Sequence, residues 1–207
     1  MKHKQKFKID ADLIEHNLDI IVLNIRRRLL DSGIPEKQIT KLTLDNVRKK
    51  PELRLLLIST EGFRVHFYFN WALSDNKPIS KLIDELADTP NPNRRDKVLI
   101  ITNKPRTRAF KLVKLKHFNY FYEYVRDFMY SIFDSPFQIK VSKIVRGNTH
   151  TDEELAQFQL LRLDDPLVRH YMLDVGDEVY YTEVINFTLM RVKLIVAPEI
   201  MYKKAKT

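Results

Sequence analysis

The run Lys97–Thr102, which reads Lys-Val-Leu-Ile-Ile-Thr, constrains the fold of this chain more than any other segment. Its four aliphatic residues follow one another without polar alternation, and three of them are β-branched. A short run of this composition is typical of a strand that lies inside a layered domain. We therefore predict a buried strand over Lys97–Thr102.

The segments around this strand alternate between helical and extended patterns. Helices are predicted where apolar residues recur at helical spacing or where a proline opens a basic segment, and strands where apolar runs lie between turn residues. The order is helix, strand, strand, helix, strand, helix, strand, which predicts a small α/β layer domain. The predicted helices are 12–32, 78–88 and 105–116, and the predicted strands are 53–59, 63–71, 97–102 and 118–122.

The first predicted helix carries its own boundary signals. Asp10 or Asp12 is a candidate N-cap, and Gly33 is a candidate stop because glycine tolerates positive φ. Arg26-Arg27-Arg28 lie near the C-terminal end, where cations oppose the helix dipole. We interpret these arginines as end-of-helix charge, with contact to nucleic acid as the alternative.

A second part of the chain is predicted to begin after Ser135-Pro136, giving domains 1–136 and 137–207. The second domain shows short mixed elements, so the whole chain is expected to be α+β, or mixed α/β. Its predicted elements are a strand over 138–145, a helix over 152–160, a helical turn after Asp165-Pro166, and a hairpin of 179–184 with 188–196.

Charge is divided unevenly between these two parts. The 207 residues carry a net charge of +9. Residues 137–207 hold ten basic and ten acidic side chains, so the whole excess lies in 1–136, with 26 basic against 17 acidic. A basic half favours phosphate backbones, RNA or an acidic protein surface as partners.

Composition excludes several classes of site and predicts neither cofactor nor metal. The absence of cysteine excludes disulfides and cysteine-zinc sites, and fits a reducing, intracellular compartment. The glycines, at 33, 62, 147 and 176, are too few for a glycine-rich phosphate loop. The six histidines lack metal-ligand spacing, and no apolar run approaches the ~20 residues of a membrane span, so no membrane contact is expected.

The segment from Lys97 to Tyr122 contains seven cations and no acid. If residues 105–116 are helical, Lys104, Arg108, Lys111 and Lys114 form one stripe, with Phe110, Val113 and Leu112 turned inward. Such a stripe can follow the backbone of a DNA duplex without reading its bases. The alternative interpretation is an ordinary solvated helix face.

Two further chemistries are disfavoured by these residues. A metal-dependent nuclease needs an acid on one central strand and an acid-x-Lys motif on the next. Here the strand over 63–71 holds no carboxylate, and Asn103 rather than an acid precedes Lys104, so a nuclease is disfavoured. The aromatic stretch 117–124 fits core packing better than base stacking, and His66 fits a structural histidine.

The stretch from 152 to 191 resembles a family signature. Its pieces are Asp152-Glu153-Glu154-Leu155, Leu160-Leu161-Arg162-Leu163, Asp165-Pro166, Arg169-His170-Tyr171, Gly176-Asp177 and Arg191. They are similar to the fifth-largest common subunit of eukaryotic-type nuclear DNA-directed RNA polymerases, which has a shorter relative in archaeal polymerases. The chain is therefore expected to be a non-catalytic component of the transcription machinery, not an enzyme by itself.

The resemblance implies a role for each part. The C-terminal domain would be a small mixed-strand assembly domain that docks on the largest polymerase subunit, with Arg169 and Arg191 as polar anchors. The N-terminal domain would be an α/β jaw near downstream DNA, with the basic stripe touching the incoming duplex. The interface residues implied are Asp165, Pro166, Arg169, Tyr171, Gly176 and Arg191, and the DNA-proximal residues are Lys104, Arg108, Lys111 and Lys114.

The chain departs from the family in its closing hairpin. The family carries an Arg-Pro-Ser-x-Thr-x-Gly segment there, whereas Thr182-Glu183-Val184-Ile185-Asn186 stands in its place. Divergence with retained architecture points to a polymerase copy outside the usual cellular lineages, such as that of a large DNA virus. The expected location is the nucleus for a cellular protein, or the virion and host cytoplasm for a viral one. The alternative function is a free, basic nucleic-acid-binding protein.

Overall fold

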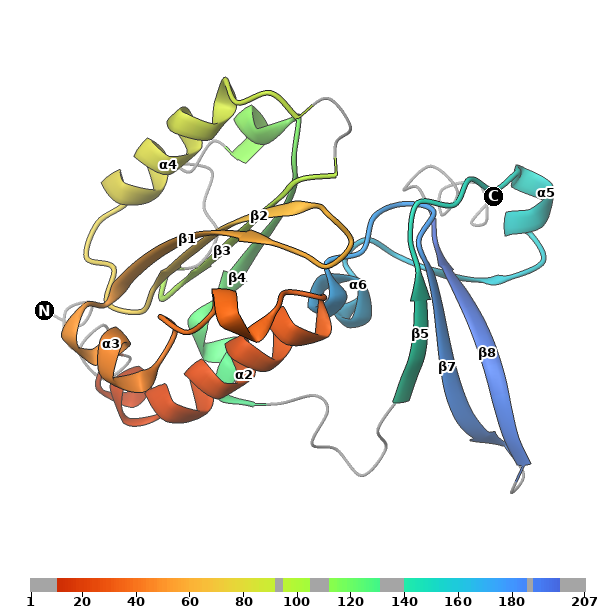
Figure 1. The fold of residues 1–207 in the computed structure, drawn as a ribbon, viewed down its shortest axis with the longest axis horizontal. Helices are drawn as coiled ribbons and strands as arrows, with labels where there is room; N and C mark the ends of the chain where they lie inside the picture. Colours follow the sequence, from red (N-terminus) through yellow and green to blue (C-terminus); the bar gives the residue numbers. More distant parts are fainter. Residues whose placement is uncertain (1–10, 92–94, 105–111, 131–139, 186–187, 198–207) are drawn as a thin grey trace, which may run out of the picture. The chain divides into compact units, whose positions relative to one another are not determined.

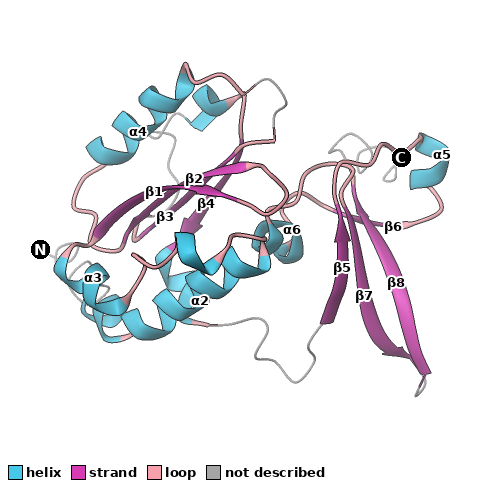
Figure 2. Ribbon diagram, in the orientation of Figure 1, coloured by secondary structure: helices cyan, strands magenta, loops and turns pink. Residues whose placement is uncertain are grey.

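The computed structural model describes residues 11–91, 95–104, 112–130, 140–185 and 188–197. Side chains at 113, 140, 183–185 and 188–191 lie outside this description. The chain divides into two compact units, residues 1–131 and 132–207. The predicted boundary at 136/137 falls in 131–139, which also lies outside the described residues. Helices and mixed sheets occur together, so the chain is α+β, as predicted (Figure 2).

The first unit is built on a four-stranded sheet in the order β1-β2-β3-β4. Strands β1 and β2 form an antiparallel hairpin, while β2, β3 and β4 run parallel. The predicted strands are confirmed with small shifts at their ends. Their bounds are β1 Glu52–Ile58, β2 Arg64–Asn70, β3 Lys97–Thr102 and β4 Asn119–Tyr124.

Helices cover both faces of this sheet (Figure 1). Helix α4 (Lys77–Ala87) and the 3₁₀ helix η3 (Leu112–Leu115) pack on one face, and α2 (Leu18–Asp31) and α3 (Leu44–Lys49) lie on the other. Every residue of β3 is buried between them, which is why its sequence shows no polar alternation. The 3₁₀ helices η1 (Glu36–Gln38) and η4 (Val125–Met129) complete the unit.

The first helix ends as predicted but does not begin as predicted. Gly33 has φ +84°, and the amides of Gly33 and Ile34 bond to the carbonyls of Leu30 and Leu29, so the glycine stops the helix. Residues 11–16 are helical, and a turn at Asn17 separates them from α2. Asp12 lies inside this first helical segment and is therefore not the N-cap, while Asp10 lies outside the described residues.

The second unit contains a four-stranded sheet in the order β5-β7-β8-β6. The hairpin β7 (Glu178–Ile185) with β8 (Thr188–Val196) is confirmed, and β5 (Lys140–Val145) pairs antiparallel with β7. The helix predicted over 152–160 is wrong beyond its first turn. Helix α5 covers only Asp152–Leu155, and Gln159–Leu161 forms β6, which pairs parallel with β8.

Helix α6 (Pro166–Tyr171) supplies part of the core of the second unit. Its Leu167 and Val168 are buried with Leu173 and with side chains from three strands of the sheet. Tyr171 is partly buried against the same cluster. The other members of the cluster are Leu161, Val179, Leu194 and Val196.

Candidate docking and nucleic-acid surfaces

The predicted basic stripe is only partly described by the structure. Arg108 and Lys111 lie outside the described residues, as does most of the helix predicted over 105–116. The last turn, Leu112–Leu115, is 3₁₀ rather than α-helical. Because a 3₁₀ helix has three residues per turn, the α-helical spacing that defined the stripe does not hold through Lys114.

Both described cations of the stripe have partners within the first unit. Lys104 Nζ donates to the carbonyl of Ser74 at 2.7 Å. Lys114 Nζ lies 2.5 Å from Asp84 Oδ1 on α4. Both side chains of this ion pair are substantially exposed, so the pair contributes at most about 1 kcal/mol and can exchange for a phosphate.

Hydrogen bonds at the ends of β3 and β4 fix the backbone around Lys104. The hydroxyl of Tyr122 donates to the carbonyl of Lys104 at 2.9 Å and lies 3.0 Å from Thr102 Oγ1. Burial raises the pKa of Tyr122 to about 12, against a smaller lowering by Thr102. The Thr102-Asn103-Lys104 segment, which stands where a nuclease would carry its acid-x-Lys motif, thus has a structural role in the sheet.

Two of the three arginines at the end of α2, Arg26 and Arg28, are structural. Arg28 is buried and pairs with buried Glu123 of β4 at 3.3 Å. Arg26 donates to the carbonyls of Ile39 and Leu42, both at 3.0 Å, and so holds the chain that follows the helix. Interpreting these two arginines only as end-of-helix charge was therefore incomplete, because they connect α2 to other elements.

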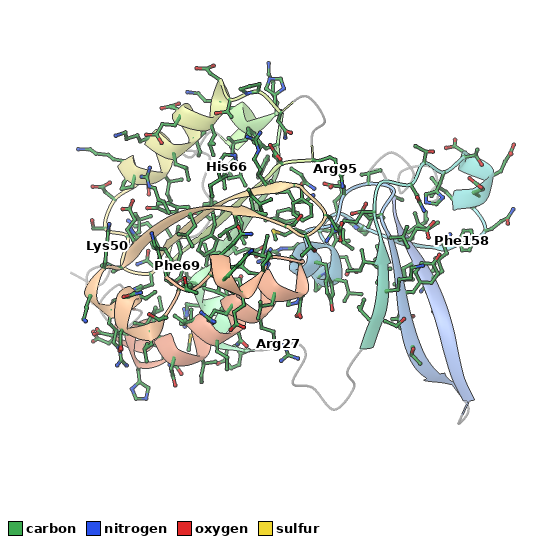
Figure 3. All side chains as sticks on the ribbon, viewed as in Figure 1. Arg27, Lys50, His66, Phe69, Arg95 and Phe158 are labelled. Carbon is green, nitrogen blue, oxygen red and sulfur yellow. The ribbon has the colours of Figure 1, made fainter. Side chains whose placement is uncertain are left out.

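A cationic surface that the sequence analysis did not select lies between α3 and β1. We name it the basic groove; its volume is about 570 Å³. Figure 3 shows Lys50 at the end of α3, next to the start of β1. Within the described residues, no carboxylate pairs with Lys41, Lys49 or Lys50. The groove is lined by Lys41, Asn46, Val47, Lys49 and Lys50 on one side and by Glu52, Leu53, Arg54 and Leu55 on the other.

One hydrogen bond caps α3 and a second ties it to the end of β2. Thr43 caps the helix by accepting from the amide of Asn46 at 3.3 Å. Trp71 Nε1 then donates to the carbonyl of Val47 at 3.0 Å, which ties α3 to the end of β2. The signal for this surface was the run Arg48-Lys49-Lys50 before a proline, together with Lys41.

Residues of the predicted docking set build the second unit. Asp165 caps α6 by accepting from the amide of Leu167 at 2.8 Å, and Pro166 is the first helical residue. Gly176 has φ +90°, and a Cβ built on it would lie 2.2 Å from the carbonyl oxygen of Asn148. The positions of these three residues are therefore explained by local architecture.

A buried ion pair stands beside this glycine. Arg146 Nη1 lies 3.2 Å from Asp177 Oδ2, and the guanidinium also donates to the carbonyls of Tyr171 and Met172. Asp177 further accepts from the amides of Gly147 and Asp174. Burial raises the pKa of Asp177, although these hydrogen bonds oppose it. The network joins the end of β5, the end of α6 and the start of β7.

A second polar cluster surrounds Glu178. Its carboxylate accepts from Lys193 Nζ at 2.8 Å, from the Tyr180 hydroxyl at 2.6 Å and from Asn148 Nδ2 at 3.0 Å. Burial alone would raise the pKa of Glu178, but these hydrogen bonds outweigh it and lower the pKa to about 2. Lys193 also lies 4.5 Å from the ring of Phe158, which is labelled in Figure 3. The carboxylate is therefore held ionised as an internal partner of Lys193.

The remaining predicted interface residues are less fully described. Arg169 and Tyr171 are half-buried on α6. The backbone of Arg191 lies in β8 opposite Thr182, and its side chain falls outside the description. Beside α6, Leu163 and Val175 leave 42% and 48% of their surface exposed.

The aromatic stretch 117–124 and His66 pack in the first unit. Phe118 and Phe121 are buried, and Tyr120 and Tyr122 are partly buried against the core, so the aromatic stretch packs as predicted. Burial lowers the pKa of His66, whose ring meets Phe118 edge-on at 5.5 Å. Among the described residues, no three acidic or histidine side chains cluster as metal ligands, and no helix there has the length and apolarity of a membrane span.

No protein-family model and no curated protein sequence matches the chain.

Proposed function

We propose that this chain is a non-catalytic subunit of a multisubunit DNA-directed RNA polymerase. Its C-terminal unit docks on the largest subunit, and its basic N-terminal unit lies near downstream duplex DNA and contacts the phosphate backbone. The other polymerase subunits complete the set of partners. The protein acts in transcription, in the nucleus if cellular or in the virion and host cytoplasm if viral.

One observation carries this proposal. Several residues that resemble the polymerase-subunit signature shape the second unit: Asp165 and Pro166 start α6, and Gly176 makes a turn that strains any other residue. Asp177, next in the signature, is the buried partner of Arg146. A sequence resemblance whose residues occupy these architectural positions is better supported than one scattered over an exposed surface.

The docking contact can be tested with surface variants of the full chain. Leu163→Asp with Val175→Asp changes two exposed aliphatic residues that flank α6, so the fold should be preserved. We expect this double variant to lose co-purification with the largest subunit. Leu23→Asp is the matched control, because Leu23 is 64% exposed on α2 in the other unit. Retained co-purification of the double variant would move the contact away from α6.

Free nucleic-acid binding is the second candidate, favoured by the 26 basic against 17 acidic residues of positions 1–136. It predicts tight duplex binding by the isolated chain, with an affinity that falls steeply as salt rises. Under the polymerase proposal, isolated binding is weak because the N-terminal unit only adds to contacts made by other subunits. A salt titration of duplex binding distinguishes the two.

A further inference from the structure

Strand β1 leaves one edge of the first sheet open. It is the end strand in the order β1-β2-β3-β4, and among the described strands it pairs with β2 alone. The amide of Ser59 donates to the carbonyl of Phe63. The backbone N–H and C=O groups of residues 53, 55, 57 and 59 therefore point toward β2. In an antiparallel ladder the alternate residues turn their backbone groups away. Glu52, Arg54, Leu56 and Ile58 therefore direct theirs toward the open edge.

At one end of this edge, the side chain of Gln38 makes the hydrogen bonds that a neighbouring strand would make. Gln38 Oε1 accepts from the amide of Ile58 at 2.7 Å, and Gln38 Nε2 donates to the carbonyl of Ile58 at 2.7 Å. One residue of an added antiparallel strand would make this same pair of bonds with its own amide and carbonyl. Within the described residues, no comparable partner meets the backbone of Arg54 or Leu56.

The open edge is apolar on one side and cationic at its end. Leu56 and Ile58 leave 56% and 50% of their surface exposed, although both lie in a strand. The basic groove then follows Glu52–Leu55 and brings Lys41, Lys49 and Lys50 beside the same stretch of backbone. Proteins usually protect such an edge, because it is a template for another strand.

These three features together identify the class of partner. A DNA backbone would use the lysines but would leave the backbone donors and the exposed aliphatic side chains without a role. An apolar peptide would use the edge but not the lysines. An extended acidic peptide, with aliphatic residues at alternate positions, satisfies all three at once.

We propose that β1 is a docking edge, and that an extended acidic segment of a partner protein adds to it as a fifth strand. Its backbone pairs with Arg54 and Leu56, and its carboxylates meet Lys41, Lys49 and Lys50. The bond pair between Gln38 and Ile58 ends the site, so the added strand spans about five residues at ~3.4 Å per residue. A strand-docking edge on β1 is compatible with either function considered above.

The test uses the full chain and a labelled heptapeptide, Glu-Val-Glu-Val-Glu-Val-Glu, followed by fluorescence anisotropy. The first control is the same peptide with the amides of one edge N-methylated, which keeps charge and side chains but removes the donors. We expect saturable binding of the first peptide and binding at least about tenfold weaker for the second, since lost backbone bonds and the steric bulk of the methyl groups act together.

Two protein variants separate the backbone contribution from charge. Leu56→Pro removes an outward amide and spares the bonds to β2, and proline is tolerated on such edges. Leu56→Thr is its matched control, because it keeps the amide. We expect proline, but not threonine, to weaken peptide binding about tenfold. The triple variant Lys41→Glu, Lys49→Glu, Lys50→Glu should weaken it at least about tenfold and reduce its salt dependence.

The amides of Arg54 and Leu56 give a direct readout, because hydrogen exchange at both should slow when the peptide is bound. The proposal is overturned if the unmodified peptide fails to bind saturably, or if N-methylation or Leu56→Pro leaves its affinity unchanged. It is also overturned if a duplex DNA displaces the peptide and binds more tightly, with that binding lost in the triple lysine variant. The groove would then be a nucleic-acid surface.

Discussion

Replacing Gly176 with alanine tests whether the signature residues shape the second unit. Two costs add together at this position. At φ +90°, an alanine pays about 1–2 kcal/mol for a left-handed backbone. Its Cβ would also lie 2.2 Å from the carbonyl oxygen of Asn148, and moving that backbone costs about 1–3 kcal/mol more. Alanine also lowers the conformational entropy of the unfolded chain, which offsets about 0.4–1 kcal/mol of this loss of stability. The expected net loss is about 1–5 kcal/mol, with a central value of about 3 kcal/mol.

Gly147 provides the matched control in the same unit. Its φ is +77°, but nothing lies within 4 Å of a Cβ built there. Gly147→Ala therefore keeps the conformational cost and omits the collision, with an expected loss of about 1 kcal/mol. The difference between the two variants isolates the contact with Asn148.

Native-state hydrogen exchange in the β7–β8 ladder measures both variants without a reporter dye. Gly176→Ala should accelerate exchange about 100-fold, and Gly147→Ala about fivefold, since about 1.4 kcal/mol corresponds to a factor of ten. Equal acceleration in the two variants would show that the approach to Asn148 carries no cost. The architectural explanation of the signature glycine would then be wrong.

Three further predictions concern polar side chains with partners inside the protein. Glu178→Gln should flatten the acid dependence of the free energy of unfolding of the second unit. The wild-type carboxylate has a pKa of about 2 against an ordinary 4.5, so it contributes up to about 3 kcal/mol of stability, which is present above pH 4.5 and lost as pH falls towards 2. Acid titration of unfolding measures this contribution. Glu123→Gln should destabilise the first unit by about 3 kcal/mol by leaving Arg28 without its buried carboxylate partner, whereas the double variant with Arg28→Met should recover most of that loss in urea unfolding. Asp165→Ala should cost about 1 kcal/mol and Asp165→Asn much less, because asparagine still caps α6; equal losses in thermal unfolding would contradict the capping role.

Local signals predicted the elements that depend on neighbouring residues. The β-branched run gave β3 its bounds, and Gly33 marked the end of α2 because its positive φ is a local requirement. Pro166 likewise marked the start of α6. Gln159 and Leu160 were misassigned to a helix, since the strand state of β6 depends on pairing with β8, more than thirty residues later.

Long-range contacts were not accessible from the sequence. The pairing of Arg28 with Glu123 joins residues 95 positions apart, so an arginine that looked like end-of-helix charge is part of the core. The basic groove depends on a hydrogen bond from Trp71 to Val47 that places α3 beside β1. The open backbone of β1 became visible only once the strand order was known.

Affinity purification of the tagged full chain from its native source at moderate salt, followed by mass spectrometry, tests whether this chain is a polymerase subunit. A polymerase subunit should recover two very large subunits stoichiometrically, together with smaller ones, and this recovery should survive nuclease treatment. Recovery of the chain alone, or only with nucleic acid that nuclease removes, would instead indicate a free nucleic-acid-binding protein.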